Sequence, residues 1–323
     1  MRAIVQVGTG GPEVLQLQEV PKPEVRAGHL LLRVTAVGVN YVDTMRRRGW
    51  VSIPPQQPYI PGIEVAGIVE AVGEGVTGWQ VGQRAMAWVP SGAYAEYCLT
   101  PAHRAMPVPE NLSDVEAAAV PVNWLTAYFA LVTLGKLQAG ERVLIHAAAG
   151  GVGTAAVQIA KLLGGVVFAT AGSEEKVELA RSLGADVAIN YERDDFEAVV
   201  RERTNGEGVH LVLESVGGEV FTKSVRCLTA GGRLIIYGHA SGKDGTVTSG
   251  DIFRRRLTIA CVAGGMMIDD PKVAEEAKER VMAWLREGKA KPIVGEVHPL
   301  KDAGIAQQRL ETRQTKGKVV LVP

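Results

Sequence analysis

The stretch from Glu141 to Gly153, ERVLIHAAAGGVG, most constrains how this chain folds. Arg142 to His146 is a short apolar run, which is typical of a buried parallel strand. A turn of small residues follows. Apolar residues then recur at helical spacing, at Val152, Ala155, Ala156, Ile159, Ala160 and Leu163. Strand, tight turn and helix predict the first unit of a dinucleotide-binding fold, because a pyrophosphate needs close backbone approach and the N–H groups of a helix amino-terminus.

The glycine fingerprint G-x-G-x-x-G is incomplete here, because Ala148 stands at its first position, before Gly150 and Gly153. Such a fingerprint alone is weak, and a glycine-rich turn of another kind of α/β protein is the alternative. The strand before the turn and the helix after it supply the context that the motif demands. The residues of the turn expected to contact a cofactor are Ala149, Gly150, Gly151 and Val152.

Composition gives no support to several classes of function. The 323 residues suggest two domains, and 35 basic against 35 acidic residues leave no net charge to favour nucleic acid or a membrane surface. We find no secretory signal and no apolar run of membrane-spanning length. The three cysteines, Cys98, Cys227 and Cys261, lie far apart without a CxxC motif, so reduced thiols in a cytoplasmic protein are expected.

The first part of the chain, to about residue 121, is rich in short strands and suggests a partly closed barrel or a sandwich. Expected strands are 3–7, 14–20, 29–37, 61–72, 83–89 and 93–99. Ser113 with Glu116 three residues on fits a capping box at the start of a helical stretch, SDVEAAAVPVNWLTAYFAL.

From Glu141 the pattern changes to strands that alternate with helices, which predicts a doubly wound parallel sheet. Expected strands are 142–146, 165–170, 186–190, 209–214, 233–237 and 257–262, and expected helices include 174–183, 194–204 and 220–228. A ligand is expected beyond the carboxyl ends of these strands, where the strand order reverses.

After Gly265 the alternation stops. A long amphipathic helix over 271–288, a second helix near 302–311 and a last strand over 318–322 have too little apolar surface for a separate core. We therefore expect this tail to pack on the amino-terminal domain. The expected domains are a discontinuous strand-rich domain of residues 1–121 and 266–323, and a nucleotide-binding domain of residues 122–265.

This organisation resembles the medium-chain dehydrogenase/reductase superfamily, and within it the zinc-free quinone oxidoreductases that include zeta-crystallin. The matching motifs are VGVNYVD (37–43), PGIEVAGIV (61–69), LTAY (125–128), HAAAGGVG (146–153), AGSEEK (171–176), INY (189–191) and ETRQTKGKVVLVP (311–323). They span the whole chain in order. The resemblance implies a GroES-like catalytic domain joined to a Rossmann domain of α/β class.

Zinc is not expected. A catalytic zinc needs about three Cys, His or carboxylate ligands. Zinc-dependent members of the superfamily have a cysteine where this chain has Asn40 and a histidine where it has Ile63, and neither residue serves as a ligand. Asp43 and Glu64 remain as acids, and a carboxylate pair without His or Cys is more often a hydrogen-bonding feature of the fold.

NADPH is the expected cofactor. In NAD-binding units an acid about 20 residues past the glycine turn binds the ribose, whereas this chain has Gly172 and Ser173 there. The resemblance implies that Lys176, Tyr191 and Arg313 hold the 2′-phosphate. Two cations and a phenol are suited to a phosphate, although each residue alone has an ordinary reading as a surface or sheet-end residue.

The expected reaction is hydride transfer to a conjugated acceptor. The resemblance places Asn40, for substrate orientation, and Thr126 near the nicotinamide, with the backbone of Gly238, His239 and Ala240 lining the same pocket. Asn40 also has a reading as a turn asparagine, and Thr126 as a buried helix threonine. The tyrosine that relatives often have after this asparagine is missing, which leaves the aromatic wall open.

The leading hypothesis is an NADPH-dependent quinone oxidoreductase. An enone or alkenal reductase shares the same hydride step, and a non-catalytic NADPH- or RNA-binding crystallin-like protein is a third alternative, which neutral charge disfavours for RNA. The apolar strand at 257–262 predicts a homodimer, since it would otherwise be an exposed sheet edge. The run 46–48 of arginines is read as a solvated face, or as a means of attracting anionic substrates.

Overall fold

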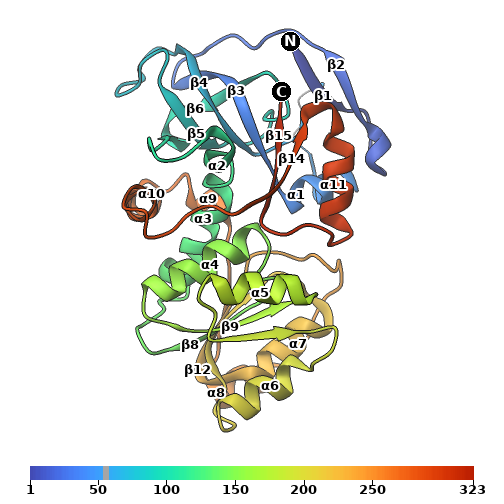
Figure 1. Cartoon of the computed structure of the whole chain (residues 1–323), viewed down its shortest axis with the longest axis vertical. Helices are drawn as coiled ribbons and strands as arrows, with labels where there is room; N and C mark the ends of the chain where they lie inside the picture. Colours follow the sequence, from blue (N-terminus) through green and yellow to red (C-terminus); the bar gives the residue numbers. More distant parts are fainter. Residues whose placement is uncertain (54–57) are drawn as a thin grey trace. The chain divides into compact units, whose positions relative to one another are not determined.

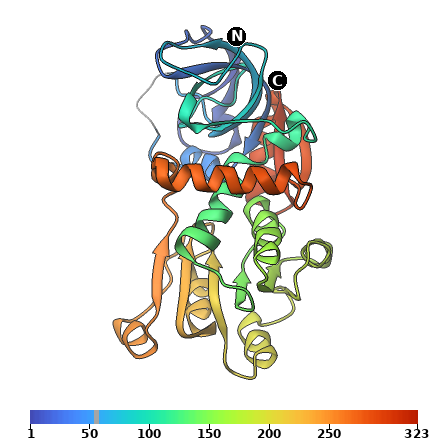
Figure 2. The same cartoon turned by 90° about the vertical axis from the view of Figure 1, so that its left-hand side faces the viewer.

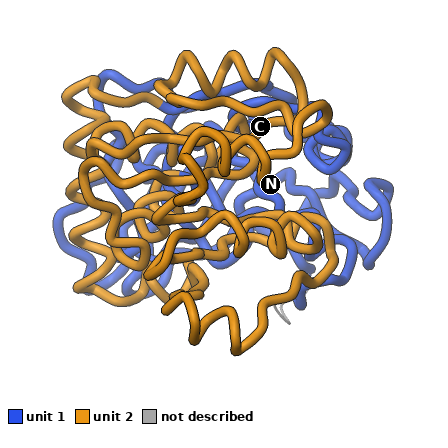
Figure 3. Tube along the Cα trace, turned by 90° about the horizontal axis from the view of Figure 1, so that it is seen from below, with its two compact units in different colours: residues 1–123, 292–323 blue, residues 124–291 orange. Residues whose placement is uncertain are grey.

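The computed structural model describes residues 1–53 and 58–323, and these form two compact units (Figure 3). Unit 1 comprises Met1–Asn123 and Pro292–Pro323, and unit 2 comprises Trp124–Lys291. Residues 266–291, expected in the first domain, therefore belong to unit 2. This difference concerns α10 (Pro271–Arg286), a single long helix (Figure 2). Two contacts with Tyr128 attach this helix to unit 2: the Tyr128 hydroxyl donates to Glu276 Oε1 at 3.0 Å, and the Tyr128 ring lies 6.1 Å from that of Trp284.

Unit 1 is built on a seven-stranded sheet in the order β14-β15-β3-β4-β5-β7, with β6 also paired to β3 (Figure 1). Its strands are β3 (His29–Val39), β4 (Glu64–Val72), β5 (Arg84–Trp88), β6 (Tyr97–Pro101), β7 (Ala105–Pro107), β14 (Val294–Pro299) and β15 (Lys318–Val322). Only the pair β14–β15 is parallel among these pairings. Strands β1 (Arg2–Gln6) and β2 (Leu15–Glu19) form a separate antiparallel pair. The last strand of the chain thus lies inside the first sheet, as expected for the returning tail.

The helices of unit 1 are short, and α1 (Tyr41–Arg47) was not expected from the sequence. Helix α2 (Asp114–Ala117) begins with the expected capping box, in which Ser113 Oγ accepts from Glu116 N and Glu116 Oε2 accepts from Ser113 N. The helical stretch expected after Ser113 forms, but it is divided into two helices. Helix α2 ends and a new helix, α3 (Pro121–Tyr128), begins, because Pro121 has no N–H to continue a helix but fits its first turn. Unit 1 also has short 3₁₀ turns at Pro12–Val14, Ala102–Arg104 and Leu300–Asp302, and the helix α11 (Ala303–Glu311). In unit 2, α3 continues into a π-helical turn at Phe129–Leu134.

Unit 2 carries a six-stranded sheet in the order β10-β9-β8-β11-β12-β13, with all pairs parallel. Its strands are β8 (Arg142–Ile145), β9 (Val166–Ala171), β10 (Val187–Asn190), β11 (Val209–Glu214), β12 (Leu228–Ile236) and β13 (Thr258–Cys261). The order reverses between β8 and β11, so the predicted doubly wound sheet is confirmed. The glycine turn that follows β8 lies at the switch point, where ligands of such sheets bind.

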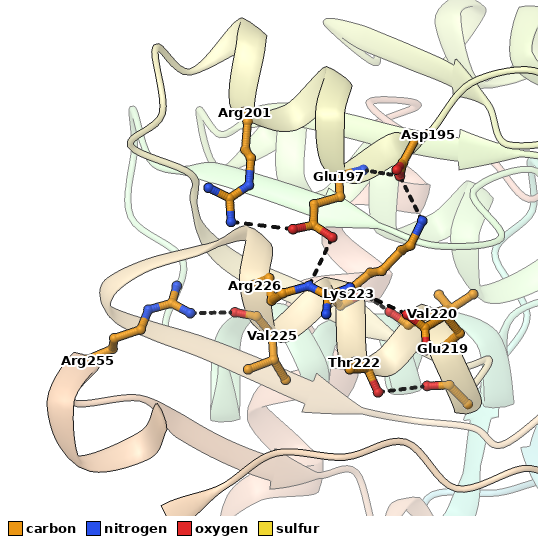
Figure 4. A network of polar contacts seen from close by, with 12 residues as sticks. Asp195, Glu197, Arg201, Glu219, Val220, Thr222, Lys223, Val225, Arg226 and Arg255 are labelled. Carbon is orange, nitrogen blue, oxygen red and sulfur yellow. Dashed lines mark hydrogen bonds and ion pairs between the residues drawn. The ribbon is translucent and has the colours of Figure 1, made fainter. Parts of the chain in front are cut away.

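Helices connect the strands of this sheet and pack on it. They are α4 (Gly151–Leu162), α5 (Glu174–Ser182), α6 (Phe196–Arg203), α7 (Gly218–Cys227) and α8 (Ser249–Arg255), and α9 (Gly264–Met267) follows the last strand. Helices α6 and α7 are joined at the surface by ion pairs between Lys223 and Asp195 and between Arg226 and Glu197 (Figure 4). These pairs are partly exposed, so their contribution to stability is small. The stability of this layer comes from the apolar core, to which Val200, Val212 and Val225 belong.

Asp43 is a buried acid in the first turn of α1. Its Oδ2 accepts the Asn40 backbone N–H at 2.9 Å and the Tyr94 hydroxyl at 3.1 Å, and the residue is fully buried. Burial raises the pKa of Asp43 to about 6, although the Asn40 N–H, Arg46, Lys318 and the Tyr94 hydroxyl oppose the shift. Because the folded state holds this proton more tightly than the unfolded state, the contribution of Asp43 to stability is complete at low pH and declines as pH rises through about 6.

We predict that replacing Asp43 by Asn removes this pH dependence. Asn retains an oxygen for the Asn40 N–H but carries no charge to bury. As pH rises from about 4 to about 6, the wild type should lose on the order of 3 kcal/mol relative to D43N, since one pKa unit corresponds to about 1.4 kcal/mol. Thermal unfolding midpoints between pH 4 and 8 measure the difference. The exposed D244N serves as the control. Parallel curves for wild type and D43N would contradict the prediction.

Gly153 is the position where the turn after β8 tolerates no side chain. A Cβ there would lie 2.2 Å from the Ala147 carbonyl oxygen and 2.6 Å from Ala148 Cα, both backbone atoms. Ala147 itself has a φ of 49°, so the turn is already tightly wound. At Gly150 a Cβ would meet only the Ala147 oxygen, at 3.3 Å. The third glycine of the fingerprint is therefore required for packing of the helix on the strand, as its role in the motif implies.

We predict that G153A destabilises unit 2 by about 1–3 kcal/mol, because the helix must move away from the strand. The matched variant G150A should cost less than about 1 kcal/mol, because its methyl group needs a shift of only a few tenths of an ångström. Urea unfolding followed by far-UV circular dichroism measures both. Equal losses for the two variants would show that the close approach at Gly153 is not the cause.

Candidate functional site

The predicted site residue Asn40 lies at the amino-terminus of α1, directly after β3, and is 7% exposed. Strand β3 is antiparallel to both β4 and β15, so the end of β3 meets the beginnings of the other two. Val39 pairs with Val319 and Val37 with Val65. At this end Asn40 follows Val39, Lys318 precedes Val319 and Glu64 precedes Val65. The polar side chains of these three residues meet in one cluster.

This polar cluster consists of Asn40, Glu64, Asn123 and Lys318. Lys318 Nζ donates to Glu64 Oε2 at 2.5 Å, to Asn40 Oδ1 at 2.7 Å and to Asn123 Oδ1 at 3.4 Å. Asn40 Nδ2 donates to Glu64 Oε2 at 3.0 Å. Glu64 is fully buried and Lys318 is 3% exposed, so the two charges are removed from water together.

Glu64 also accepts the Val122 backbone N–H through Oε1 at 2.7 Å. Val122 is in the first turn of α3, where N–H groups lack partners within the helix. The acid noted in the sequence as a hydrogen-bonding feature therefore joins the sheet, a helix amino-terminus and Asn40. Lys318 was missed by sequence reasoning. Its signal was a lysine at the head of a fully apolar final strand, KVVLV, where a solvated lysine is usual.

The predicted cofactor residues of unit 2 gather at the carboxyl ends of its strands. Gly150 caps α4 in extended conformation, and no side chain caps this helix, so Gly151 and Val152 present first-turn backbone N–H groups. Ala149 precedes them and is buried. Gly238, His239 and Ala240 follow β12, where the Ala240 N–H donates to the Ser215 carbonyl at 2.9 Å. These two segments lie at the ends of β8 and β12, with β11 between them.

The end of β9 carries no acidic side chain. Gly172 follows it, and Ser173 caps α5 by accepting from the Lys176 N–H at 3.3 Å. A Cβ at Gly172 would meet the Tyr191 hydroxyl at 2.5 Å, so this phenol, which follows the neighbouring strand β10, lies directly against the bare backbone of Gly172. The structure thus brings Gly172, Ser173, Lys176 and Tyr191 together. Thr126 lies in α3 of unit 2 and is 6% exposed.

Arg313 follows α11 in unit 1, with a left-handed φ of 57°. Unit 1 also holds a cavity of about 450 Å³ lined by Arg47, Arg48, Trp50 and Glu311 among others. Arg47 is 1% exposed and pairs with Glu311 at 2.5 Å, and Arg48 pairs with the same carboxylate at 2.6 Å. The expectation that residues 46–48 form a solvated face is therefore wrong for Arg47, and the shared acid weakens the attraction of this run for anionic substrates.

In residues 1–53 and 58–323 no group of three or more His, Cys, Asp and Glu side chains is placed to hold a metal ion. Asn40 and Ile63, at the positions where zinc-dependent relatives carry ligands, are both buried. His146 is also unsuited to this role, because both of its ring nitrogens are hydrogen-bonded, to the hydroxyls of Thr170 and Ser224. Burial lowers the pKa of His146 to about 3, so the ring stays neutral. Among the described helices none has the length and apolar composition needed to cross a membrane.

Comparisons with known proteins agree with this arrangement. The alcohol dehydrogenase GroES-like domain matches residues 26–110, and the zinc-binding dehydrogenase domain matches residues 151–286. A 2-haloacrylate reductase of Burkholderia sp is 37% identical over 97% of this chain and 96% of the relative. The quinone oxidoreductase of Rattus norvegicus is 34% identical over 100% and 98%. The structure of Escherichia coli quinone oxidoreductase complexed with NADPH is 33% identical, covers 100% of both chains and superposes with a TM-score of 0.94.

The similarities to these three relatives extend over 97–100% of the chain. They therefore include both units and the returning tail, and not one common domain alone. The glycine turn at the switch point of the parallel sheet is consistent with these similarities. The chain belongs to the quinone oxidoreductase family of the medium-chain dehydrogenase/reductase superfamily.

Proposed function

We propose that this protein is an NADPH-dependent, zinc-independent oxidoreductase that reduces a quinone. The observation that carries the proposal is the end of β9, where Gly172 and Ser173 replace the acid that would repel a ribose phosphate, with Lys176 and Tyr191 beside them. Two solved relatives in complex with NADPH, one mycobacterial and one from Escherichia coli, support the choice of cofactor. Quinone oxidoreductases among the relatives support the choice of substrate.

The chain's own residues fit NADPH. The uncapped amino-terminus of α4 and the small residues Ala149 to Val152 would receive the pyrophosphate, since both backbone access and N–H groups are present. Lys176, Tyr191 and Arg313 would bind the 2′-phosphate, with Ser173 at the start of α5. Asn40, Thr126 and the segment from Gly238 to Ala240 would line the nicotinamide end.

When bound, the dihydronicotinamide supplies the hydride. The residues proposed as catalytic, Asn40 and Thr126, orient the reacting groups and carry no exchangeable proton of suitable acidity. The proton that completes the product therefore comes from water, which is sufficient for a quinone. Asn40 and Ile63 are not zinc ligands, and the proposed scheme uses no Lewis acid.

Reduction of a carbon–carbon double bond conjugated to a carbonyl is the second candidate. The specific observation in its favour is the 37% identity to a 2-haloacrylate reductase over nearly the full length of both chains. The same hydride step serves both substrates, and only the acceptor pocket would differ. A non-catalytic NADPH- or RNA-binding role remains the third reading. A homodimer formed through β13, which is the edge of the sheet, and a cytoplasmic location stay predictions.

A panel of quinones and enones tested for NADPH oxidation decides between the candidates. We expect turnover with at least one quinone, at a kcat/KM above that for enones and 2-haloacrylates. Dialysis against a strong chelator should leave this activity unchanged, and elemental analysis should find less than stoichiometric zinc. Activity confined to the conjugated double bonds would favour the second candidate. Zinc-restored activity after chelation would refute the metal-independent mechanism.

Removal of either phosphate-binding cation should separate the two cofactors. A charge-assisted hydrogen bond contributes about 1.5–3 kcal/mol, so K176A and R313A should each weaken NADPH binding by about tenfold or more. NADH lacks the 2′-phosphate, so its binding should change by less than about twofold. Isothermal titration measures both, with K223A as a control, because Lys223 pairs with Asp195 between α6 and α7 (Figure 4). Equal weakening of NADH and NADPH would mean that these residues stabilise the protein and do not bind the phosphate.

A further inference from the structure

The amide of Asn40 has only one chemically acceptable orientation. Its Oδ1 faces the ammonium of Lys318 at 2.7 Å, while Nδ2 faces two acceptors, the Gly38 carbonyl at 3.1 Å and Glu64 Oε2 at 3.0 Å. Rotation of the amide by 180° would place Nδ2 against a cation and Oδ1 against a carbonyl and a carboxylate. The surrounding charges therefore determine which atom is oxygen.

Gly38 lies against this ion pair and leaves no room for a side chain. A Cβ at residue 38 would lie 2.5 Å from Glu64 Oε2 and 2.7 Å from Lys318 Cε. The ion pair thus occupies the space that a side chain would fill, and the Gly38 carbonyl faces Asn40. The three donor hydrogens of Lys318 meet Glu64, Asn40 and Asn123. Lys318 is consequently bound on all sides and has no role as a proton donor in this arrangement.

The hydrogen-bond capacity of Asn40 follows from these contacts. Both hydrogens of Nδ2 are engaged, so the side chain has no donor left for a ligand. The remaining capacity is an acceptor site on Oδ1. The carbonyl oxygen of a quinone or an enone is itself an acceptor and gains no hydrogen bond there. An amide N–H or a hydroxyl is complementary, and the nicotinamide riboside end of the cofactor carries both.

We propose that Lys318 is a positioning residue that holds Asn40 as a hydrogen-bond acceptor, so that Asn40 receives an N–H or O–H group of the bound cofactor and does not bind the carbonyl of the acceptor substrate. This rests on the proposed function, since it assigns the ligand group of Asn40 within that site. Asn40 was expected both to orient the substrate and to contact the cofactor, and the proposal keeps only the second role and assigns it to Oδ1 as an acceptor.

The test uses paired variants, because loss of Lys318 alone would leave Glu64 buried without its partner and threaten folding. E64Q/K318M removes both charges together and removes the donor that fixes Oδ1. N40A removes the amide. K278M is the matched control, because Lys278 is 7% exposed, pairs with Glu275 and lies in α10 of unit 2.

The Kd of NADPH and the KM of the quinone together show whether Asn40 binds the cofactor or the substrate. One lost hydrogen bond corresponds to roughly tenfold in affinity, so N40A and E64Q/K318M should each raise the Kd of NADPH by about that factor. The triple variant should be no worse than N40A, since both changes remove the same interaction. The KM of the quinone should change by less than about twofold. A raised quinone KM at constant NADPH affinity, or losses that multiply in the triple variant, would overturn the proposal.

The side-chain amide signals of Asn40 provide a readout that does not depend on activity. Comparison of ¹H–¹⁵N spectra of the wild type and N40A identifies them. We expect slow solvent exchange of both Nδ2 hydrogens in the wild type and K278M, and at least tenfold faster exchange in E64Q/K318M. Unchanged exchange in E64Q/K318M would refute the role of Lys318. Faster exchange in E64Q/K318M together with wild-type NADPH affinity in N40A would support the positioning of Asn40 by Lys318. It would refute the acceptor role of Asn40, and with it this part of the proposed function.

Discussion

The buried pair of Lys318 and Glu64 is the interaction on which the arrangement of unit 1 depends. It joins the first residue of β15 to the first residue of β4, and through Val122 it reaches the amino-terminus of α3. Because both charges are almost entirely removed from water, neither is tolerated without the other. Such a pair is a poor source of net stability, but it has few alternative arrangements. It therefore specifies where the returning carboxyl-terminal strand pairs, and where the helix that leaves unit 1 begins.

Much of the fold was predictable because its signals are local. The strands and helices around the switch point follow from apolar runs, glycine turns and helix caps, and the predicted strand 209–214 coincides with β11. Ser113 and Glu116 form the capping box that their spacing indicates. The turn from Ala147 to Gly153 was recognised although its first glycine is missing, because the alternation of strand and helix around it is clear. Local periodicity and turn chemistry are sufficient where each element packs in the order of the sequence.

The remaining features depend on contacts between residues far apart in the chain. Helix α1 has only seven residues, and its first turn is anchored by Asp43, whose burial is decided by Tyr94 and the surrounding core. Helix α10 was expected in the first domain because the tail has too little apolar surface for a separate core, yet Trp284 and Glu276 attach it to Tyr128. Lys318 could not be distinguished from a surface lysine, because its partners are 254 and 278 residues away. Neither amphipathic pattern nor composition reveals such pairings.

Under the proposed zinc-independent function, hydrogen bonds of the polar cluster orient the site residue Asn40. A metal fixes the orientation of its ligands by direct coordination, and a second shell of hydrogen bonds then holds those ligands. Asn40 was expected at the position where zinc-dependent members have a ligand, and here the ammonium of Lys318 fixes its oxygen while Glu64 and Gly38 fix its nitrogen. The ammonium of Lys318 is buried and its charge is balanced by Glu64. It therefore orients the Asn40 amide but does not polarise a substrate carbonyl, as a Lewis acid would. Hydride transfer to an acceptor that is already electron-poor, such as a quinone, is the kind of reaction that needs orientation more than polarisation.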